Sequence, residues 1–243
     1  MRENKRLLVT GASSDFGTAL IKEIGTDYEK IYAHYNHENE AFTGLCENLK
    51  DRIIPIRADF SDVGSLDGMI DQIVSDGGAD HFVHLAAPGL KPLQFRKTDW
   101  DAFEDPLRIS LRSAVKLSGA LLPGMAKNSY GKIIFMLSSV TLNLPPKYEA
   151  AYTVSKYALL GLMKSLSAEY AEKGITVNGV SPDLTETKFL KEFPKLIIQK
   201  NAEESPLKRN LTVNDVIPAF RYLLSDGADA VAGLNLSVTG GVQ

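Results

Sequence analysis

The stretch that decides the fold is Thr10-Gly11-Ala12-Ser13-Ser14-Asp15-Phe16-Gly17, which follows the apolar run Arg6–Thr10 and leads into an amphipathic run. A strand, a loop of small residues and a helix in this order begin a βαβ unit. Small residues let the backbone approach a pyrophosphate, and the first helical turn offers N–H groups and a positive dipole. The alternative is an ordinary strand–helix turn in which Asp15 caps the helix. The position after the first strand favours phosphate binding.

Apolar and amphipathic runs alternate along the remainder of the chain. Strands are expected at Arg6–Thr10, Lys30–Tyr35, Ile53–Arg57, His81–Ala86, Lys132–Ser138, Thr176–Ser181 and Asn235–Val238. Helices are expected at Phe16–Ile24, Leu66–Val74, Leu107–Met125, Tyr152–Glu172 and Val213–Leu224. Nearly all-apolar strands that alternate with helices are typical of a parallel sheet buried on both faces. The sequence therefore predicts an α/β fold, a single doubly wound Rossmann-type domain over residues 1–243 with about seven parallel strands flanked by helices.

Small and polar residues stand where several of these strands end. They are Thr10-Gly11, Tyr35-Asn36, Asp59, Ala86-Ala87, Ser138-Ser139 and Ser181-Pro182. Ligands of doubly wound sheets bind beyond the carboxyl ends of the strands. We therefore expect these residues to meet at one edge of the sheet and to form one site.

Tyr152 and Lys156 are four residues apart, and Ser139 lies 13 residues before the tyrosine. In a helix, the first spacing places the phenol and the ammonium on one face. A cation beside a phenol favours the phenolate, so a lowered tyrosine pKa is expected. With a serine to hold a substrate oxygen, the tyrosine can move a proton in carbonyl reduction or alcohol oxidation. The alternative is a pair of neighbours on a helix surface, and the expected position at the sheet edge argues against it.

The composition limits the classes of partner. The chain has 243 residues, of which 44% are apolar and 23% charged, as in a globular protein with a substantial core. A net charge of −3 with scattered basic residues argues against nucleic acid or an anionic membrane as the main partner. Cys46 is the only cysteine, so no internal disulfide forms, and a cytoplasmic location is expected. No apolar run approaches the length of a membrane span, and no metal site is expected.

With these motifs in place, the chain resembles the short-chain dehydrogenase/reductase family over nearly its full length, and within it the 3-oxoacyl-(acyl carrier protein) reductases. The residues that carry the resemblance are Thr10–Gly17, Ala58–Ser61, Ser139, Tyr152, Lys156, Val177–Pro182, Thr187 and Val238–Gly241. The resemblance implies a nicotinamide-dependent interconversion of a carbonyl and a secondary alcohol. It also implies a homotetramer or a homodimer, which the apolar residues around the two longest predicted helices allow.

The resemblance assigns roles to individual residues. Catalysis is assigned to Ser139, Tyr152, Lys156 and Ser110. Cofactor contacts are assigned to Gly11, Ser13, Ser14, Asp15, Phe16, Tyr35, Asn36, Asp59, Phe60, Ala86, Ala87, Tyr152, Lys156, Pro182, Asp183, Leu184 and Thr187. Tyr152 exchanges the proton, Ser139 binds the substrate oxygen, and Lys156 lowers the tyrosine pKa and binds the nicotinamide ribose.

Four positions depart from the family's pattern. Asp15 and Asp183 each stand where the family has a glycine, Val83–Ala87 replaces Val-Asn-Asn-Ala-Gly, and Ser110 replaces the asparagine of a proton relay. A carboxylate near a pyrophosphate should repel it unless it turns away and caps the helix. His84 is expected to be a hydrogen-bonded structural residue rather than a proton shuttle. An active enzyme with an altered cofactor cradle is favoured over a protein that has lost tight cofactor binding.

The end of the second predicted strand bears on the choice of cofactor. Members of this fold that bind NAD hold the ribose 2′-hydroxyl with Asp or Glu there, whereas this chain has Tyr35. Asn36, Ser14 and a charged His37 can hydrogen-bond a 2′-phosphate, although no Arg or Lys is present. NADP(H) is therefore expected in preference to NAD(H), and the alternative is that these are only polar turn residues.

The segment after Thr187 is expected to form a lid or, alternatively, a plain amphipathic surface helix. Its apolar residues are Phe189, Leu190, Phe193, Leu196, Ile197 and Ile198, with a break at Pro194. Pro145–Tyr148 is expected to wall the site. An apolar lid suits a ketone, an acyl thioester or a polyketide-like substrate, and a sugar or small diol also fits. The first hypothesis is an NADP(H)-dependent carbonyl reductase. The alternatives are an NAD-dependent alcohol or sugar dehydrogenase and a catalytically impaired nucleotide- or partner-binding protein.

Overall fold

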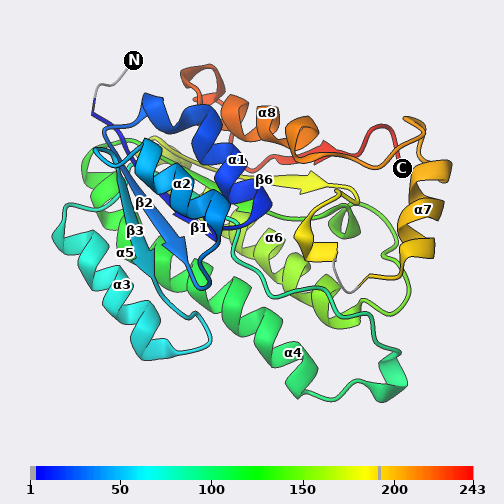
Figure 1. The fold of residues 1–243 in the computed structure, drawn as a ribbon. Helices are drawn as coiled ribbons and strands as arrows, with labels where there is room; N and C mark the ends of the chain where they lie inside the picture. The colour runs from blue at the N-terminus through cyan, green and yellow to red at the C-terminus, as the bar shows by residue number, and fades with distance from the viewer. Residues whose placement is uncertain (1–3, 191–192, 243) are drawn as a thin grey trace.

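One seven-stranded parallel sheet organises the molecule (Figure 1). The computed structural model describes residues 4–190 and 193–242. The strands are β1 Arg6–Thr10, β2 Lys30–Tyr35, β3 Ile53–Arg57, β4 His81–His84, β5 Gly131–Met136, β6 Ile175–Pro182 and β7 Asn235–Val238. Their spatial order is β3-β2-β1-β4-β5-β6-β7, so the winding reverses between β1 and β4. This is the predicted doubly wound arrangement, in which ligands bind at the reversal point.

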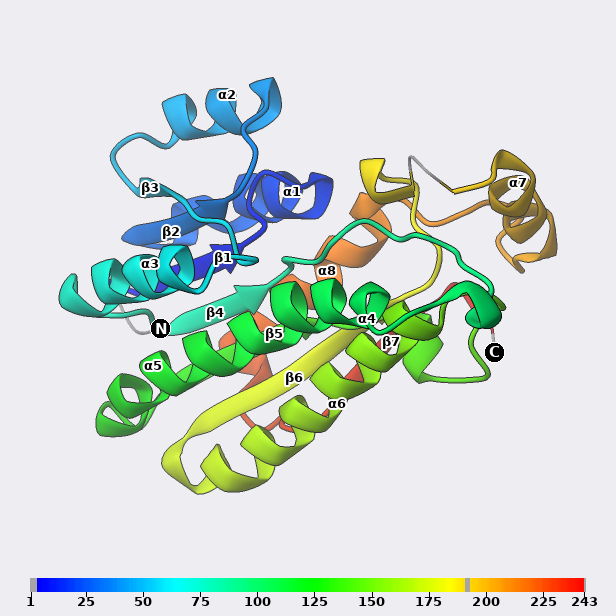
Figure 2. The same cartoon turned by 90° about the horizontal axis from the view of Figure 1, so that it is seen from below.

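Helices cover both faces of the sheet (Figures 1 and 2). They are α1 Asp15–Ile24, α2 Glu40–Asn48, α3 Val63–Ser75, α4 Asp101–Pro106, α5 Ser113–Lys127, α6 Ala150–Tyr170, α7 Lys195–Glu204 and α8 Val213–Leu224. Side chains of α1, α2 and α8 form one core, and those of α3, α5 and α6 form the other. In β1, Leu7 and Val9 belong to the first core and Leu8 to the second, because successive strand residues face opposite sides. The apolar strands are thus buried on both faces, as expected.

The helix predicted at Leu107–Met125 differs most from its expected form. A helical course already begins with α4, and Leu107–Arg112 forms a π-helix before α5 continues. Pro106, which has no N–H for the helical hydrogen-bond ladder, is the last residue of α4 and directly precedes the π-helix. Ser110 therefore lies in an irregular turn rather than in a regular helix.

The predicted lid forms two pieces. A 3-10 helix spans Lys188–Leu190, and α7 begins after Pro194. Phe193 is buried, whereas the Leu196 side chain is 77% exposed. The expectation of an apolar inner face is therefore right for Phe193 and wrong for Leu196. Within the described part of the chain, no helix combines the length and apolar character that a membrane crossing requires.

Candidate active site

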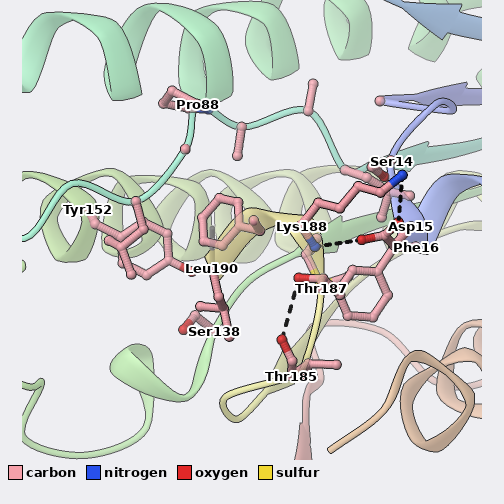
Figure 3. Close-up of a pocket in the computed structure, with 18 of the residues that line it drawn as sticks. Ser14, Asp15, Phe16, Pro88, Ser138, Tyr152, Thr185, Thr187, Lys188 and Leu190 are labelled. Atoms are coloured by element: carbon pink, nitrogen blue, oxygen red, sulfur yellow. Dashed lines mark hydrogen bonds and ion pairs between the residues drawn. The ribbon is translucent and has the colours of Figure 1, made fainter. Parts of the chain in front are cut away.

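A pocket of about 870 Å³ lies where β1, β4, β5 and β6 end (Figure 3). This volume is within the range of small-molecule and cofactor sites. The predicted site residues that line it are Gly11, Ser13, Ser14, Asp15, Phe16, Asn36, Asp59, Phe60, Ala86, Ala87, Ser139, Tyr152, Lys156, Pro182, Asp183, Leu184 and Thr187. Two further predicted site residues, Tyr35 and Ser110, do not line it. The structure thus brings most of the expected site together.

The loop after β1 is shaped to approach a ligand closely. Gly11 has a φ of +69°, which glycine adopts without a steric cost. A Cβ on Gly17 would collide with the carbonyl oxygen of Gly11, so α1 packs directly on the loop. The Ser14 hydroxyl accepts the N–H of Gly17 at 3.0 Å and caps α1. A capped helix N-terminus behind a tight loop fits the pyrophosphate of a dinucleotide.

His34, near the end of β2, holds this loop in place. Its Nδ1 accepts the N–H of Gly11 at 3.1 Å, and its Nε2 lies 3.0 Å from the carbonyl oxygen of Ala58. A ring that accepts at Nδ1 and donates at Nε2 is neutral, and burial lowers the pKa of His34 to about 4. The ring stacks on Phe60 with 3.9 Å between centroids. The sequence motifs give no sign of this role, although His34 stands at the end of a predicted strand.

Asp15 directs its carboxylate toward the segment after β6 (Figure 3). Oδ2 accepts the backbone N–H of Lys188 at 2.7 Å, and Oδ1 lies 3.9 Å from Lys188 Nζ. The residue that caps α1 is Ser14, so the alternative in which Asp15 caps the helix is not found. The cation at Lys188 reduces the repulsion that an isolated carboxylate would exert on a pyrophosphate.

At the end of β2, where the ribose of the cofactor is expected, the structure differs from the prediction. Tyr35 packs against Phe42 with 5.0 Å between ring centroids and contacts the core, so its predicted cofactor contact has no counterpart in the pocket. Asn36 and His37 do line the pocket, and Glu38 lies beside them. A carboxylate is therefore present near this end, although the sequence pattern places none at the strand terminus.

His84 is a structural residue, as expected. Its Nδ1 lies 2.8 Å from the Thr10 hydroxyl, and its Nε2 lies 2.9 Å from the carbonyl oxygen of Ser110. Full burial lowers the pKa of His84 to about 3, so the ring is neutral at physiological pH. The Ser110 carbonyl is thus occupied by the histidine, and the buried Ser110 hydroxyl has no hydrogen-bond partner among the described residues. Ser110 also does not line the pocket, and its part in a proton relay stays a prediction.

Tyr152 and Lys156 face the same side of α6, as their spacing predicts. Lys156 Nζ lies 5.5 Å from the centroid of the Tyr152 ring. The ammonium also donates to the carbonyl oxygen of Met136 at 2.8 Å, at the end of β5. Helix α6 and strand β5 together therefore fix the position of the pair at the carboxyl edge of the sheet.

The expected lowering of the tyrosine pKa is not found. Burial raises the pKa of Tyr152 to about 12, with a further increase from the charge of Glu149. Burial also lowers the pKa of Lys156 to about 8. Both shifts follow from the cost of holding a charge away from water, and this cost exceeds the mutual effect of the pair. Tyr152 is therefore protonated at neutral pH and is poised as a proton donor.

The two serines at the end of β5 have different partners. Ser139 Oγ donates to Asp183 Oδ1 at 2.9 Å. Ser138 forms a hydrogen bond with the Tyr152 side chain that lowers the tyrosine pKa and partly offsets burial. Spacing selects Ser139, but a hydroxyl has one proton to donate, and Asp183 accepts that of Ser139. The sequence prediction missed Ser138, for which the adjacent pair of serines was the only signal.

The end of the pocket near Tyr152 combines an acid with an apolar cover. Glu149 precedes α6 and is 6% exposed, and burial raises its pKa to about 7. Phe189 lies on Tyr152 with 6.0 Å between ring centroids. The other apolar residues that line this end are Pro146, Leu190, Phe193 and Ile197. The structure places Pro146 and the first part of the predicted lid at the pocket, as expected.

Comparisons with known proteins agree with this geometry. A family model described as enoyl-(acyl carrier protein) reductase matches residues 12–243. A 3-oxoacyl-(acyl-carrier-protein) reductase, FabG, of Buchnera aphidicola subsp. Acyrthosiphon pisum (strain APS) is 31% identical over 246 residues, which cover 96% of this chain and 95% of that protein. The uncharacterized oxidoreductase YmfI of Bacillus subtilis (strain 168) is 29% identical, and the match covers 98% of each protein. The solved structure of ElxO with NADP bound is 23% identical, with a TM-score of 0.86 and 98% of each chain covered.

A doubly wound sheet with a dinucleotide loop and a tyrosine–lysine pair at one edge defines a nicotinamide-dependent class of oxidoreductase. The chain belongs to the short-chain dehydrogenase/reductase family. The family assigns the reaction class, and the solved structure supports the fold. The roles of individual residues stay predictions.

Proposed function

We propose that this protein is an NADP(H)-dependent reductase that converts a ketone into a secondary alcohol, with Tyr152 as the proton donor. The observation that carries the proposal is the position of Tyr152 and Lys156 together in the pocket whose other end is the dinucleotide loop. In Figure 3, Tyr152 and Asp15 lie on opposite sides of the pocket, with the segment that contains Leu190 between them. One pocket can therefore hold both a dinucleotide and a substrate carbonyl.

A reduced nicotinamide bound in this pocket would supply the hydride to the carbonyl carbon. Tyr152 donates its hydroxyl proton to the carbonyl oxygen as that oxygen gains charge. Its raised pKa keeps the proton in place near neutral pH, which suits the reductive direction. Lys156 stabilises the resulting phenolate, and Ser138 positions the tyrosine oxygen. Phe189 and its apolar neighbours keep water from the reacting atoms.

The choice of NADP(H) rests on Asn36, His37 and Ser14 as hydrogen-bond donors for a 2′-phosphate. ElxO, a structural neighbour with NADP bound, is compatible with this choice. Glu38 favours the alternative, an NAD-dependent alcohol or sugar dehydrogenase, because a carboxylate repels a 2′-phosphate and accepts a hydrogen bond from a 2′-hydroxyl. Separate titrations with NADPH and NADH decide between the two.

A 3-oxoacyl thioester is the first substrate to try. Relatives named 3-oxoacyl-(acyl-carrier-protein) reductase support it, and the apolar cover formed by Phe189, Leu190 and Phe193 suits an acyl chain. The expected homotetramer or homodimer stays a prediction, and exposed Val154 and Tyr157 on the outer side of α6 favour it. The expected cytoplasmic location is also a prediction.

Tyr152→Phe tests the mechanism. We expect turnover of acetoacetyl-CoA to fall by about 100-fold or more, because the ring keeps its packing and loses the transferable proton. Fluorescence titration should show that binding of NADPH, or of NADH, is nearly unchanged. Tyr157→Phe, an exposed tyrosine on the same helix, is the matched control and should keep wild-type turnover.

Unchanged turnover in Tyr152→Phe would contradict the role of the tyrosine. Wild-type protein that binds neither cofactor at millimolar concentration would contradict the proposed function. The interpretation as a catalytically impaired nucleotide- or partner-binding protein would then become the first hypothesis, with the Ser139–Asp183 hydrogen bond as its structural basis.

A further inference from the structure

One contact joins two segments that are far apart in the sequence and meet at the pocket. Asp15 is the first residue of α1, and Lys188 begins the 3-10 helix after β6. Asp15 Oδ2 accepts the Lys188 backbone N–H at 2.7 Å. The Lys188 ammonium lies 3.9 Å from the other carboxylate oxygen and is largely exposed, at 77%. The backbone of Lys188 is thus held firmly, while its side chain is free to turn.

The contact lies across the pocket (Figure 3). Asp15 and its neighbours in the phosphate loop line one side, and Thr187 to Leu190 line another. Phe189, in the segment held by Asp15, packs on the ring of Tyr152. A single hydrogen bond therefore connects the dinucleotide loop with the segment that covers the reacting end.

Without Lys188, negative charge would exceed positive charge around the expected pyrophosphate site. A pyrophosphate at the N-terminus of α1 would bring negative charge near Asp15. Among the described residues that line the pocket, Lys156 and Lys188 are the lysines, and no arginine lines it. Lys156 donates to Met136 beside Tyr152, at the reacting end. Lys188 is therefore the described lysine available to the phosphates.

We propose that Asp15 and Lys188 form a clamp that closes residues 187–190 over a bound nicotinamide dinucleotide and presents the Lys188 ammonium to its pyrophosphate. The inference rests on the proposed function only in that the ligand is a nicotinamide dinucleotide. The acid that replaces a small residue in the phosphate loop then strengthens retention of the cofactor, because it recruits a cation and a cover. The clamp acts on release of the cofactor and leaves the chemical step to Tyr152.

A simpler account gives Asp15 only a local effect, as an acid in the first turn of α1 that repels phosphate. The two accounts predict opposite signs. If Asp15 only repels, Asp15→Ala tightens cofactor binding and slows its release. If Asp15 forms the clamp, Asp15→Ala releases the backbone of Lys188 and speeds cofactor release.

The first experiment measures NADPH release by stopped-flow fluorescence, or NADH release if that cofactor binds more tightly. We expect Asp15→Ala and Lys188→Met each to speed release by about tenfold, as for the loss of one charge-assisted hydrogen bond. The double variant should be no faster than the faster single variant, because Asp15→Ala already frees the segment that presents the Lys188 ammonium. Lys195→Met removes an exposed lysine at the start of α7 and should leave release unchanged. Slower or unchanged release from Asp15→Ala, or additive effects in the double variant, would overturn the clamp.

A second experiment needs no cofactor and no turnover. Hydrogen exchange of the peptide that contains Lys188 should be about tenfold faster in Asp15→Ala, because the amide loses its acceptor. Lys188→Met keeps the amide and the acceptor and should exchange as the wild type does, and so should Asp15→Asn, which keeps an acceptor oxygen. If neither cofactor binds, the proposed function and the clamp on a cofactor both fail, whereas failure of the exchange comparison alone overturns only the clamp. Equal exchange in Asp15→Ala and wild type would show that the hydrogen bond does not hold the segment.

Discussion

The phosphate end and the reacting end of the pocket depart from the family pattern in opposite ways. At the phosphate end, Asp15 replaces a glycine, yet the loop keeps its tight turn and the helix keeps its cap through Ser14. At the reacting end, Ser139 is retained, yet its hydroxyl donates to Asp183. A changed residue can thus leave a geometry intact, and an unchanged residue can acquire a different partner. At this site the identity of a residue does not determine its hydrogen-bond partner.

Gly17→Ala should give the largest effect, because it breaks the intact geometry of the phosphate end. The new methyl group would meet the Gly11 carbonyl and the Ala12 backbone, and neither can move without a shift of the loop against α1. We expect a loss of about 1 to 3 kcal/mol in stability and about 100-fold in cofactor affinity. Thermal unfolding and NADPH titration measure both quantities.

Gly68→Ala is the control for this substitution. Gly68 is exposed on α3, and a Cβ there meets nothing within 4 Å. It should stabilise the protein by up to about 1 kcal/mol, as expected for alanine in a helix. Wild-type cofactor affinity in Gly17→Ala would show that the loop does not need its close contact with α1.

The serine pair sharpens the comparison at the reacting end. Ser138→Ala should lower kcat by about 10- to 100-fold, because Ser138 is the hydroxyl that contacts Tyr152. Ser139→Ala should lower kcat by no more than about threefold, since its proton already goes to Asp183. Steady-state kinetics with a matched pair of alanine variants compares the two positions directly. A larger loss in Ser139→Ala would restore the assignment made from spacing.

Glu149→Gln should give the smallest effect. A carboxyl group whose folded-state pKa is raised binds its proton more tightly in the folded protein than in the unfolded chain. The stabilisation that comes from the protonated Glu149 is therefore fully present below the ordinary pKa of 4.5 and is lost as the pH rises through about 7. The glutamine is neutral throughout and escapes this loss. Allowing for solvent in the pocket, we expect about 1 to 2 kcal/mol, or roughly 3 °C in Tm, in favour of the variant at pH 8.

At pH 4.5 the two proteins should melt together, and scanning calorimetry at the two pH values checks the sign. Glu172→Gln is the control, because Glu172 is exposed beyond the end of α6. A variant that is less stable than the wild type at pH 8 would mean that the Glu149 carboxylate has a favourable partner.

Sequence patterns predict the fold well because burial and periodicity determine it. Seven apolar runs become the seven strands, and the boundaries of β1, β2, β3 and β7 agree with those predicted. The phosphate loop is also predictable, since Gly11 and Gly17 are needed wherever a helix packs on a tight turn. The π-helix after Pro106 could not be predicted, because prolines also occur inside the regular helices α5 and α8.

The direction of individual side chains at the site is less predictable. Tyr35 ends β2 and Asn36 follows it, yet only Asn36 lines the pocket, because Tyr35 packs against Phe42. The partner of Ser139, Asp183, lies 44 residues away, directly after β6, at a distance that no local spacing encodes. The tyrosine pKa was mispredicted because spacing gives the position of the Lys156 charge but not the cost of burial.

The strand order has a consequence for how the molecule can change. The residues proposed to hold the dinucleotide come mostly from the chain up to β4, and those proposed for the chemistry come from β5 onward. Such halves could be exchanged between relatives as modules, one for cofactor choice and one for substrate. The contact between Asp15 and Lys188 joins the two halves. A chimera of two relatives would therefore keep the clamp only if Asp15 and Lys188 were both taken from this chain.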